Sequence, residues 1–380
     1  MSGYTGTMNA GAITRRETRG IPGHATKGCR MFHRRLPWAV LVTAAAVTTA
    51  TACSSLNAAG SSRAATGSGQ TATTTTMAAS SSDFALHALP GGGMSWFYSQ
   101  INGARSSIDL TMYELQDTTA EKDLASAEAA GVKVRVILDG YEKSANSGAY
   151  NYLSGHNVGV VWSWDKYYYT HEKCMVVDGR TADIMTLNLQ SQYYSTTRDF
   201  AVVDTDASDV SAIVNVFNHD YAHTSVTPGA GADLVWSPTT SQAKLTALIN
   251  GAKSSIRIYS EEMDDPTVTS DLVSAAKRGV KVQVVGENED GEYDSEYQQL
   301  YDAGVQISYF SSSTGFYIHG KVIMTDYGTS GSKIFIGSQN FSNTSLNDNR
   351  ELGLIISDSS LETNVNGDFT NDFAKGKRFT

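Results

Sequence analysis

Beyond residue 83 the chain switches repeatedly between the two-residue spacing of a strand and the wider spacing of a helix. The longest expected helix is rich in Ala and Glu and stops at Gly131. The expected strands are 108–112, 132–138 and 158–162, and the expected helices are 118–130 and 150–153. Strands that alternate with helices predict an α/β fold in which helices pack on a mixed β-sheet.

The chain also repeats itself. Two segments recur 148 positions later and a third recurs 152 positions later: 101–108 as 249–256, 131–136 as 279–284, and 217–222 as 369–374. A repeat of this length predicts two duplicated lobes rather than a solenoid of short units. We place the first lobe at 84–227 and the second at 228–380, with a joint rich in Pro and Gly between them.

The N-terminal part has a different composition. An apolar run rich in Ala, Val and Thr covers 38–52 and directly follows a basic segment, which is the layout of a secretory signal. The run is too short and too rich in Thr for a comfortable membrane span. We interpret 1–52 as an N-terminal extension with an export signal, and we expect Met31 to be the true start. Residues 53–83 are mainly Ser, Thr, Ala and Gly, which predicts a flexible tether.

Three cysteines are present, at positions 29, 53 and 174. Cys53 lies at the expected cleavage point and resembles the lipid-modified cysteine of bacterial lipoproteins, although Ala50 stands where that motif usually has Leu. We therefore expect an extracellular protein, either secreted or lipid-anchored through Cys53 to the outer face of the cell membrane. Cys174 is the remaining internal thiol, which excludes an intramolecular disulfide framework, and its apolar neighbours predict a core residue.

The charge of the chain limits its partners. Its 29 Lys and Arg against 39 Asp and Glu give a net charge of −10. Residues 1–52 contain seven of the bases and one of the acids, so the remainder carries 22 bases against 38 acids, a net charge of −16. A body this acidic repels polyphosphate chains at long range, which argues against non-specific binding of nucleic acid.

Of the eight histidines, only His171 and His319 occupy equivalent positions in the two copies. Each begins a His-x-Lys-x4-Asp pattern, and each pattern is followed by a polar pair and then by an acid. The first copy comprises His171, Lys173, Asp178, Thr186, Asn188 and Asp199, and the second comprises His319, Lys321, Asp326, Ser338, Asn340 and Glu351. A single histidine would be interpreted as an ordinary core or surface residue, but the duplication favours catalysis.

These motifs resemble the two HKD signatures of the phospholipase D superfamily over about residues 84–380. The second copy has the family form, whereas the first has Met185 in place of Gly and Asp199 in place of the usual Glu. Met185 is a side chain that could crowd the phosphate site. The resemblance implies an α/β protein of two duplicated lobes, each a mixed β-sheet flanked by helices, with the active site at their pseudo-two-fold interface.

The resemblance also implies roles for these residues. His171 would attack phosphorus and form a phosphohistidine, and His319 would protonate the leaving group and then activate water. Four further groups would hold the phosphate oxygens, namely Lys173, Lys321, Asn188 and Asn340, with Ser338 and Thr186 secondary. Asp199 and Glu351 would orient the histidines through the other ring nitrogen. Asp178 and Asp326 complete the catalytic motif, and we expect them to fix its backbone rather than to contact substrate.

The residues themselves suit this chemistry. In a His-x-Lys strand both side chains point to the same face, so that an imidazole and an ammonium group can converge on one phosphoryl group. Phosphodiester cleavage needs a nucleophile, a proton for the leaving alkoxide and positive groups around the phosphate oxygens. We expect no metal and no other cofactor, because the two lysines supply the charge that a cation would.

Weaker candidates have simpler explanations. His219 and His223 have a spacing that could suggest zinc, but a solvated helix face is the better interpretation. Two acidic pairs match across the lobes and could line the pocket mouth near a cationic head group, although we expect surface carboxylates: Glu114 with Glu262, and Asp139 with Glu287. Aromatic residues precede both histidines, at 162–169 and at 309–317. They could embrace a quaternary ammonium, enter a lipid surface or pack within the strands.

Our first hypothesis is an exported phospholipase D-like phosphodiesterase that hydrolyses glycerophospholipids at a membrane surface to phosphatidate and a head-group alcohol. It would act as a monomer without an obligate protein partner. The alternative is a secreted, metal-independent nuclease of the same superfamily, against which the acidic body and the aromatic residues weigh. A third hypothesis is a catalytically silent binding protein in which Met185 blocks the first half-site, and the retention of His171, Lys173, Asn188 and Asp199 weighs against it.

Overall fold

A computed structural model describes residues 83–380 of the chain. The expected export signal, the start at Met31, Cys53 and the tether up to residue 82 lie outside the described residues. Within 83–380, none of the helices combines the length and the apolar character that a membrane crossing requires.

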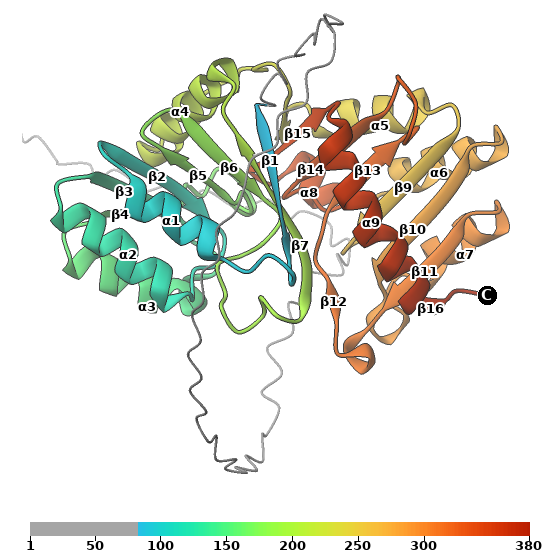
Figure 1. The fold of residues 1–380 in the computed structure, drawn as a ribbon, viewed down its shortest axis with the longest axis horizontal. Helices are drawn as coiled ribbons and strands as arrows, with labels where there is room; N and C mark the ends of the chain where they lie inside the picture. Colours follow the sequence, from blue (N-terminus) through green and yellow to red (C-terminus); the bar gives the residue numbers. More distant parts are fainter. Residues whose placement is uncertain (1–82) are drawn as a thin grey trace, which may run out of the picture. The chain divides into compact units, whose positions relative to one another are not determined.

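The first lobe is a mixed sheet with strand order β1-β7-β6-β5-β2-β3-β4 (Figure 1). Strands β2, β3 and β4 are parallel, and the others pair antiparallel. The elements are β1 Phe84–Leu89, α1 Ser95–Gly103, β2 Ser107–Met112, α2 Thr118–Ala129, β3 Lys133–Leu138, α3 Lys143–Gly155, β4 Gly159–Trp162, β5 Cys174–Val177, β6 Thr181–Met185, β7 Thr197–Asp204 and α4 Ala207–Tyr221.

The second lobe repeats this arrangement in a sheet of order β16-β11-β10-β9-β13-β14-β15-β8. Its elements are β8 Leu234–Ser237, α5 Ser241–Gly251, β9 Ser255–Ser260, α6 Pro266–Lys277, β10 Lys281–Glu287, η1 Glu289–Gly291, α7 Asp294–Asp302, β11 Gln306–Phe310, η2 Ser312–Thr314, β12 Tyr317–Ile318, β13 Val322–Thr325, β14 Lys333–Gly337, α8 Asn343–Asn347, β15 Glu351–Ile356, α9 Ser359–Lys375 and β16 Lys377–Arg378. The short strand β12 pairs with β7, so the segment before His319 is part of the first sheet.

The elements expected from periodicity are confirmed, with small changes at their ends. The weakest of them, a helix at 150–153, is the last part of the longer helix α3. Helices α2 and α6 begin at matching aspartates, since the carboxylates of Asp117 and Asp265 accept hydrogen bonds from backbone amides of the first turn. Both helices are followed by a glycine with positive φ, which ends the helical path: Gly131 at 93° and Gly279 at 88°.

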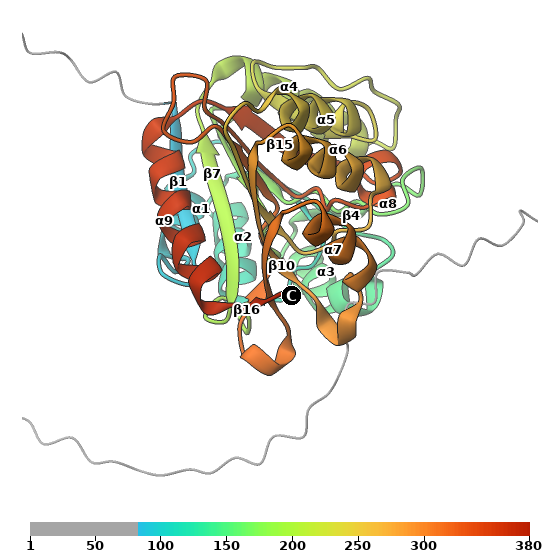
Figure 2. The ribbon, with the colours of Figure 1, turned by 90° about the vertical axis from the view of Figure 1, so that its right-hand side faces the viewer.

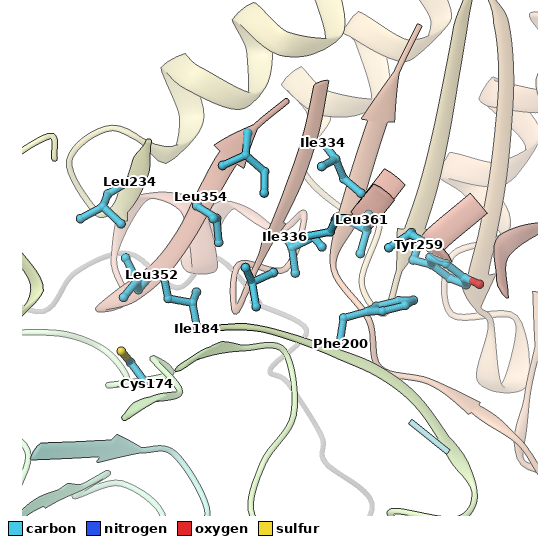
Figure 3. Packing of buried hydrophobic residues seen from close by; sticks show 14 of the residues in the cluster. Cys174, Ile184, Phe200, Leu234, Tyr259, Ile334, Ile336, Leu352, Leu354 and Leu361 are labelled. Carbon is cyan, nitrogen blue, oxygen red and sulfur yellow. The ribbon is translucent and has the colours of Figure 1, made fainter. Parts of the chain in front are cut away.

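The two lobes share a hydrophobic core. One buried cluster joins Cys174, Ile184 and Phe200 of the first lobe to Leu352, Ile336 and Tyr259 of the second (Figure 3). Two further clusters each lie within one lobe, between the sheet and its helices. Helix α9 of the second lobe lies alongside β1 of the first (Figure 2). Burial of apolar side chains from both lobes fixes them against each other, and Cys174 is the core residue that was expected.

Candidate active site

His171 and His319 lie at the interface between the lobes, and both are buried. The prediction that each His-x-Lys segment is a strand was wrong, because both segments precede their strands, β5 and β13. The position of each lysine side chain is fixed instead by a hydrogen bond to the backbone carbonyl of the histidine two residues before it. Lys173 Nζ donates to the carbonyl of His171 at 2.7 Å, and Lys321 Nζ donates to the carbonyl of His319 at 2.5 Å.

Each histidine is held by a carboxylate of the opposite lobe. His171 Nδ1 lies 2.9 Å from Glu351 Oε2, and His319 Nδ1 lies 2.7 Å from Asp199 Oδ1. Burial would raise the pKa of each carboxyl, but the facing imidazole and its hydrogen bond outweigh burial and lower the pKa below its usual value. An ionised carboxylate can only accept, so Nδ1–H is the donor and Nε2 remains for chemistry.

A second layer of hydrogen bonds orients the carboxylates. Ser345 Oγ and Asn349 Nδ2 donate to Glu351 Oε1 at 2.6 and 2.9 Å, and Thr186 Oγ1 donates to Asp199 Oδ1 at 2.6 Å. Ser345 and Asn349 were not among the predicted site residues. Thr186 was expected as a secondary phosphate ligand, whereas its hydroxyl supports Asp199 from the same lobe. Ser338 Oγ, expected in the same role, bonds the backbone of Leu352 in β15.

The amides of Asn188 and Asn340 occupy equivalent buried positions beside the histidines' carboxylate network. Within residues 83–380, the side-chain oxygen of each has no hydrogen-bond partner. Asn188 Nδ2 makes a long contact of 3.5 Å to Glu114. Buried polar atoms without partners are uncommon in folded proteins, so these two amides remain candidates for contact with a ligand.

Asp178 and Asp326 do not lie among the groups that surround the imidazoles. Each accepts hydrogen bonds from three consecutive backbone amides, those of 105–107 and of 253–255 respectively. Burial opposes ionisation of Asp178, but these hydrogen bonds outweigh it and lower its pKa to about 2. Both residues have positive φ, 54° and 52°, in the turn after the strand. They therefore hold the backbone of the motif in place.

Asp139 and Glu287, expected at the surface, are buried, and that prediction was wrong. Asp139 accepts from the backbone amide of Thr170 at 2.7 Å, and Glu287 accepts from that of Ile318 at 2.5 Å. These amides directly precede the two histidines. Burial raises the pKa of both carboxyl groups. These two carboxylates, at the ends of strands, therefore fix the backbone just before each histidine. Glu114, also expected at the surface, is buried as well.

Two arginines brace the lobes across the interface. Arg198 Nε lies 2.6 Å from Asp372 of α9, and Arg350 Nε lies 2.8 Å from Asp220 of α4. Each arginine directly precedes the carboxylate that orients a histidine. Sequence reasoning missed these pairs, although both aspartates lie in the repeated segment 217–222 and 369–374. The signal was the retention of this acidic residue in both copies of the repeat.

Met185 does not crowd the phosphate site. Its side chain is fully buried in the cluster between the first sheet and its helices, together with Met112 and Leu187. Its neighbour Ile184 points to the opposite face, into the core shared by the lobes. Alternation along β6 therefore removes Met185 from the interface.

A chain of aromatic rings connects the surface to His171. Tyr141 and Tyr168 are exposed and stack at 5.6 Å, and both contact Tyr169, at 5.1 and 4.6 Å. Tyr169 contacts Tyr113 at 5.8 Å, and Tyr113 contacts the ring of His171 at 4.6 Å. An adjoining pocket of about 520 Å³ is lined by residues of both lobes, including Asp139, Tyr141, Trp164, Tyr168 and Asp348.

The electrostatics of the interface favour the neutral form of His171. Burial lowers the pKa of His171 to about 4, against the opposing effect of Glu351. Burial also lowers the pKa of Lys173 to about 7. The ammonium group of Lys321, from the second lobe, adds to both shifts. Groups from the two lobes therefore act on each other across one small site, where an anion would relieve the mutual repulsion of the lysines.

Comparisons with known proteins agree with this architecture. A family model described as cardiolipin synthase, PLD-like domain, matches the chain twice, at residues 97–221 and 245–374. Polyphosphate kinase from Porphyromonas gingivalis is similar with a TM-score of 0.62 at 14% identity, over 76% of this chain and 46% of that chain. The present chain thus spans just under half the length of the kinase.

Phosphatidylserine synthase from Haemophilus influenzae Rd KW20 is similar with a TM-score of 0.60 at 12% identity, over 78% of this chain and 87% of that chain. At such identities the likeness concerns the fold alone. A search among curated protein sequences gave no significant match.

Proposed function

Since the chain belongs to the phospholipase D superfamily of phosphodiester-acting enzymes, we propose that it hydrolyses glycerophospholipids to phosphatidate and the head-group alcohol. One observation carries this proposal. Two buried histidines, each held at Nδ1 by a carboxylate of the opposite lobe, lie beside two buried lysines at a single interface. This set provides a nucleophile, an acid and positive charge.

The reaction has two steps. Nε2 of His171 attacks phosphorus, the phosphorus–nitrogen bond forms, and the bond to the head-group oxygen breaks as His319 gives that oxygen its proton. Water then attacks phosphorus, His319 takes a proton from the water, and the phosphorus–nitrogen bond breaks. Lys173 and Lys321, with Asn188 and Asn340, stabilise the phosphate oxygens, so the proposed reaction uses no metal or other cofactor.

Two features support a lipid substrate over nucleic acid. The exposed rings of Tyr141 and Tyr168 begin an aromatic path that ends at His171, which suits contact with a lipid surface or a quaternary ammonium head group. The net charge of −16 after residue 52 opposes the approach of a polyphosphate chain. A nuclease would need a basic surface to overcome that repulsion.

We also propose that the protein acts as a monomer outside the cytoplasm, secreted or anchored through Cys53. The proposal is supported by the apolar run 38–52 and by Cys53 at its end. Mass spectrometry of the N-terminus of protein from an expressing bacterium would detect a lipid-modified Cys53 or a cleaved, unmodified start near it. An intact N-terminus that begins at Met1 or Met31 would contradict export by this signal.

The test of substrate class is a single screen in the presence of EDTA. Purified protein is offered vesicles of phosphatidylcholine or phosphatidylethanolamine, single-stranded DNA and duplex DNA. We expect release of choline or ethanolamine together with phosphatidate, and no DNA cleavage. DNA cleavage without lipid turnover would establish the nuclease alternative, and loss of all activity with EDTA would contradict the metal-independent reaction.

A further inference from the structure

The two half-sites differ at one pair of equivalent positions. Tyr113 is the first residue after β2, and Glu261 is the first residue after β9, 148 positions later. Both side chains are buried beside the histidine and lysine of their own lobe. The first half-site therefore has an aromatic ring where the second has a carboxylate.

Glu261 contacts the reactive groups of the second half-site. Its Oε2 lies 2.5 Å from Lys321 Nζ and 3.7 Å from Nε2 of His319, and the hydroxyl of Tyr317 donates to its Oε1 at 2.6 Å. Nδ1 of His319 is already bonded to Asp199. Glu261 thus lies beside the one ring nitrogen that remains for proton transfer.

Tyr113 makes the corresponding contacts without charge. Its ring lies edge-to-face with the ring of His171 at 4.6 Å, and Lys173 Nζ lies 4.9 Å from its centroid. The face of an aromatic ring stabilises the lysine cation, but the ring offers no carboxylate to Nε2 of His171.

We infer that Glu261 breaks the symmetry of the site by holding a proton on Nε2 of His319, which makes His319 the acid of the first step and leaves His171 as the neutral nucleophile. This inference rests on the proposed phosphodiesterase function. Glu261 acts through His319 and Lys321, so it is a positioning residue. At 3.7 Å in a buried site, a carboxylate favours an imidazolium over a neutral imidazole.

The charged groups around the two histidines agree with this assignment. His319 is faced by Asp199 from β7, by Glu261 after β9, and by Tyr317 and Lys321 of its own segment. Burial opposes ionisation of Glu261, but Lys321 and His319 outweigh it and lower its pKa well below the usual value. His171 is faced by Glu351 from β15, by Tyr113 after β2, and by Lys173 and Lys321.

The test compares two leaving groups in the full-length protein. An alkyl alcohol such as choline needs a proton as it leaves, whereas p-nitrophenol leaves readily as an anion. We expect Glu261→Gln to slow choline release from phosphatidylcholine by about 10²-fold, and to slow hydrolysis of a p-nitrophenyl phosphodiester by much less.

Glu262→Gln is the matched control, since it removes the same charge one residue away and should leave the ratio of the two hydrolysis rates near that of the wild type. Glu261→Asp keeps the charge and should retain a ratio of the two hydrolysis rates near that of the wild type, which preserves the test if Glu261→Gln does not fold. Equal losses of rate with both leaving groups would overturn the inference. So would acid-labile phosphate trapped on His319 in the wild type.

Failure of the proposed function has a different signature. If the wild-type protein turns over neither diester, the phosphodiesterase proposal itself fails. If it turns over both and Glu261→Gln changes both equally, the phosphodiesterase stands and only the role of Glu261 is refuted.

Discussion

Nδ1 of His171 in the first lobe is hydrogen-bonded to Glu351 in the second, at 2.9 Å and across 180 positions of sequence. The reciprocal bond joins His319 to Asp199 across 120 positions. Neither lobe alone therefore contains an oriented histidine. The site forms only when the two lobes pack against each other. The shared hydrophobic core and the two arginine–aspartate pairs between the lobes are therefore needed to form it.

We expect His171→Asn and His319→Asn each to abolish turnover, with a loss of 10³-fold or more, because each histidine carries a separate step. Release of choline from vesicles measures the loss. His156→Asn is the matched control, since His156 is exposed at the C-terminal end of α3, where its ring contacts only Tyr152 among the contacts described. Normal turnover in either active-site variant would refute the paired-histidine mechanism.

Glu351→Gln should lower kcat by about 10²-fold or more while it leaves the fold intact. The amide keeps the shape of Glu351 but removes the negative charge that stabilises the positive charge developing on the His171 ring as Nε2 bonds phosphorus, and its NH₂ can force the wrong tautomer on the ring. The measurement is kcat beside the midpoint of thermal unfolding. A large fall in thermal stability with little change in kcat would show that Glu351 serves folding rather than orientation.

Asp372→Asn should destabilise the protein by about 3 kcal/mol, because the buried guanidinium of Arg198 loses the carboxylate that it contacts most closely. Asp368→Asn provides the control. Asp368 lies 3.5 Å from the same guanidinium but is partly exposed, so its loss should cost less than about 1 kcal/mol. Urea unfolding measures the free energy of unfolding of both variants. Similar losses in the two variants would contradict a special role for the Arg198–Asp372 ion pair.

Glu172 should make stability depend on pH. Burial raises its pKa to about 8, compared with 4.5 in an unfolded chain. The folded state therefore holds a proton that the unfolded state releases, and stability falls as the pH rises from about 4.5 to 8. Glu172→Gln should stabilise the protein at pH 8 and change little at pH 4. Urea unfolding at both values tests the sign, and destabilisation at pH 8 would contradict it.

Replacement of Tyr141 and Tyr168 by Ser should weaken binding to phosphatidylcholine vesicles by roughly tenfold, about 1.4 kcal/mol, because two exposed rings would no longer enter the lipid surface. Turnover of a soluble p-nitrophenyl phosphodiester should change little. Vesicle sedimentation and the soluble assay are run on the same preparation. Unchanged vesicle binding would show that these two rings do not contribute to contact with the lipid surface.

Features that depend on local pattern and on duplication could be predicted from the amino-acid sequence. Periodicity located the strands and helices, and the repeat separated His171 and His319 from six other histidines. The apolar neighbours of Cys174 predicted its place in the core. These inferences succeed because hydrophobic spacing and residue identity at equivalent positions are properties of short segments, which can be compared without knowledge of their partners.

Which side chains lie in contact could be seen only in the folded protein. Spacing along the chain does not show that Glu351 is hydrogen-bonded to His171 and Asp199 to His319. In the folded protein each histidine contacts the carboxylate of the opposite lobe, not the one that follows it in its own copy of the motif. Asp139 and Glu287 resemble surface carboxylates until their buried amide donors are seen. Glu261 lies beside the reactive nitrogen of His319 only because the segment after β9 and the segment before β13 fold against each other. Contacts of this kind are set by packing between distant segments, so no local pattern encodes them.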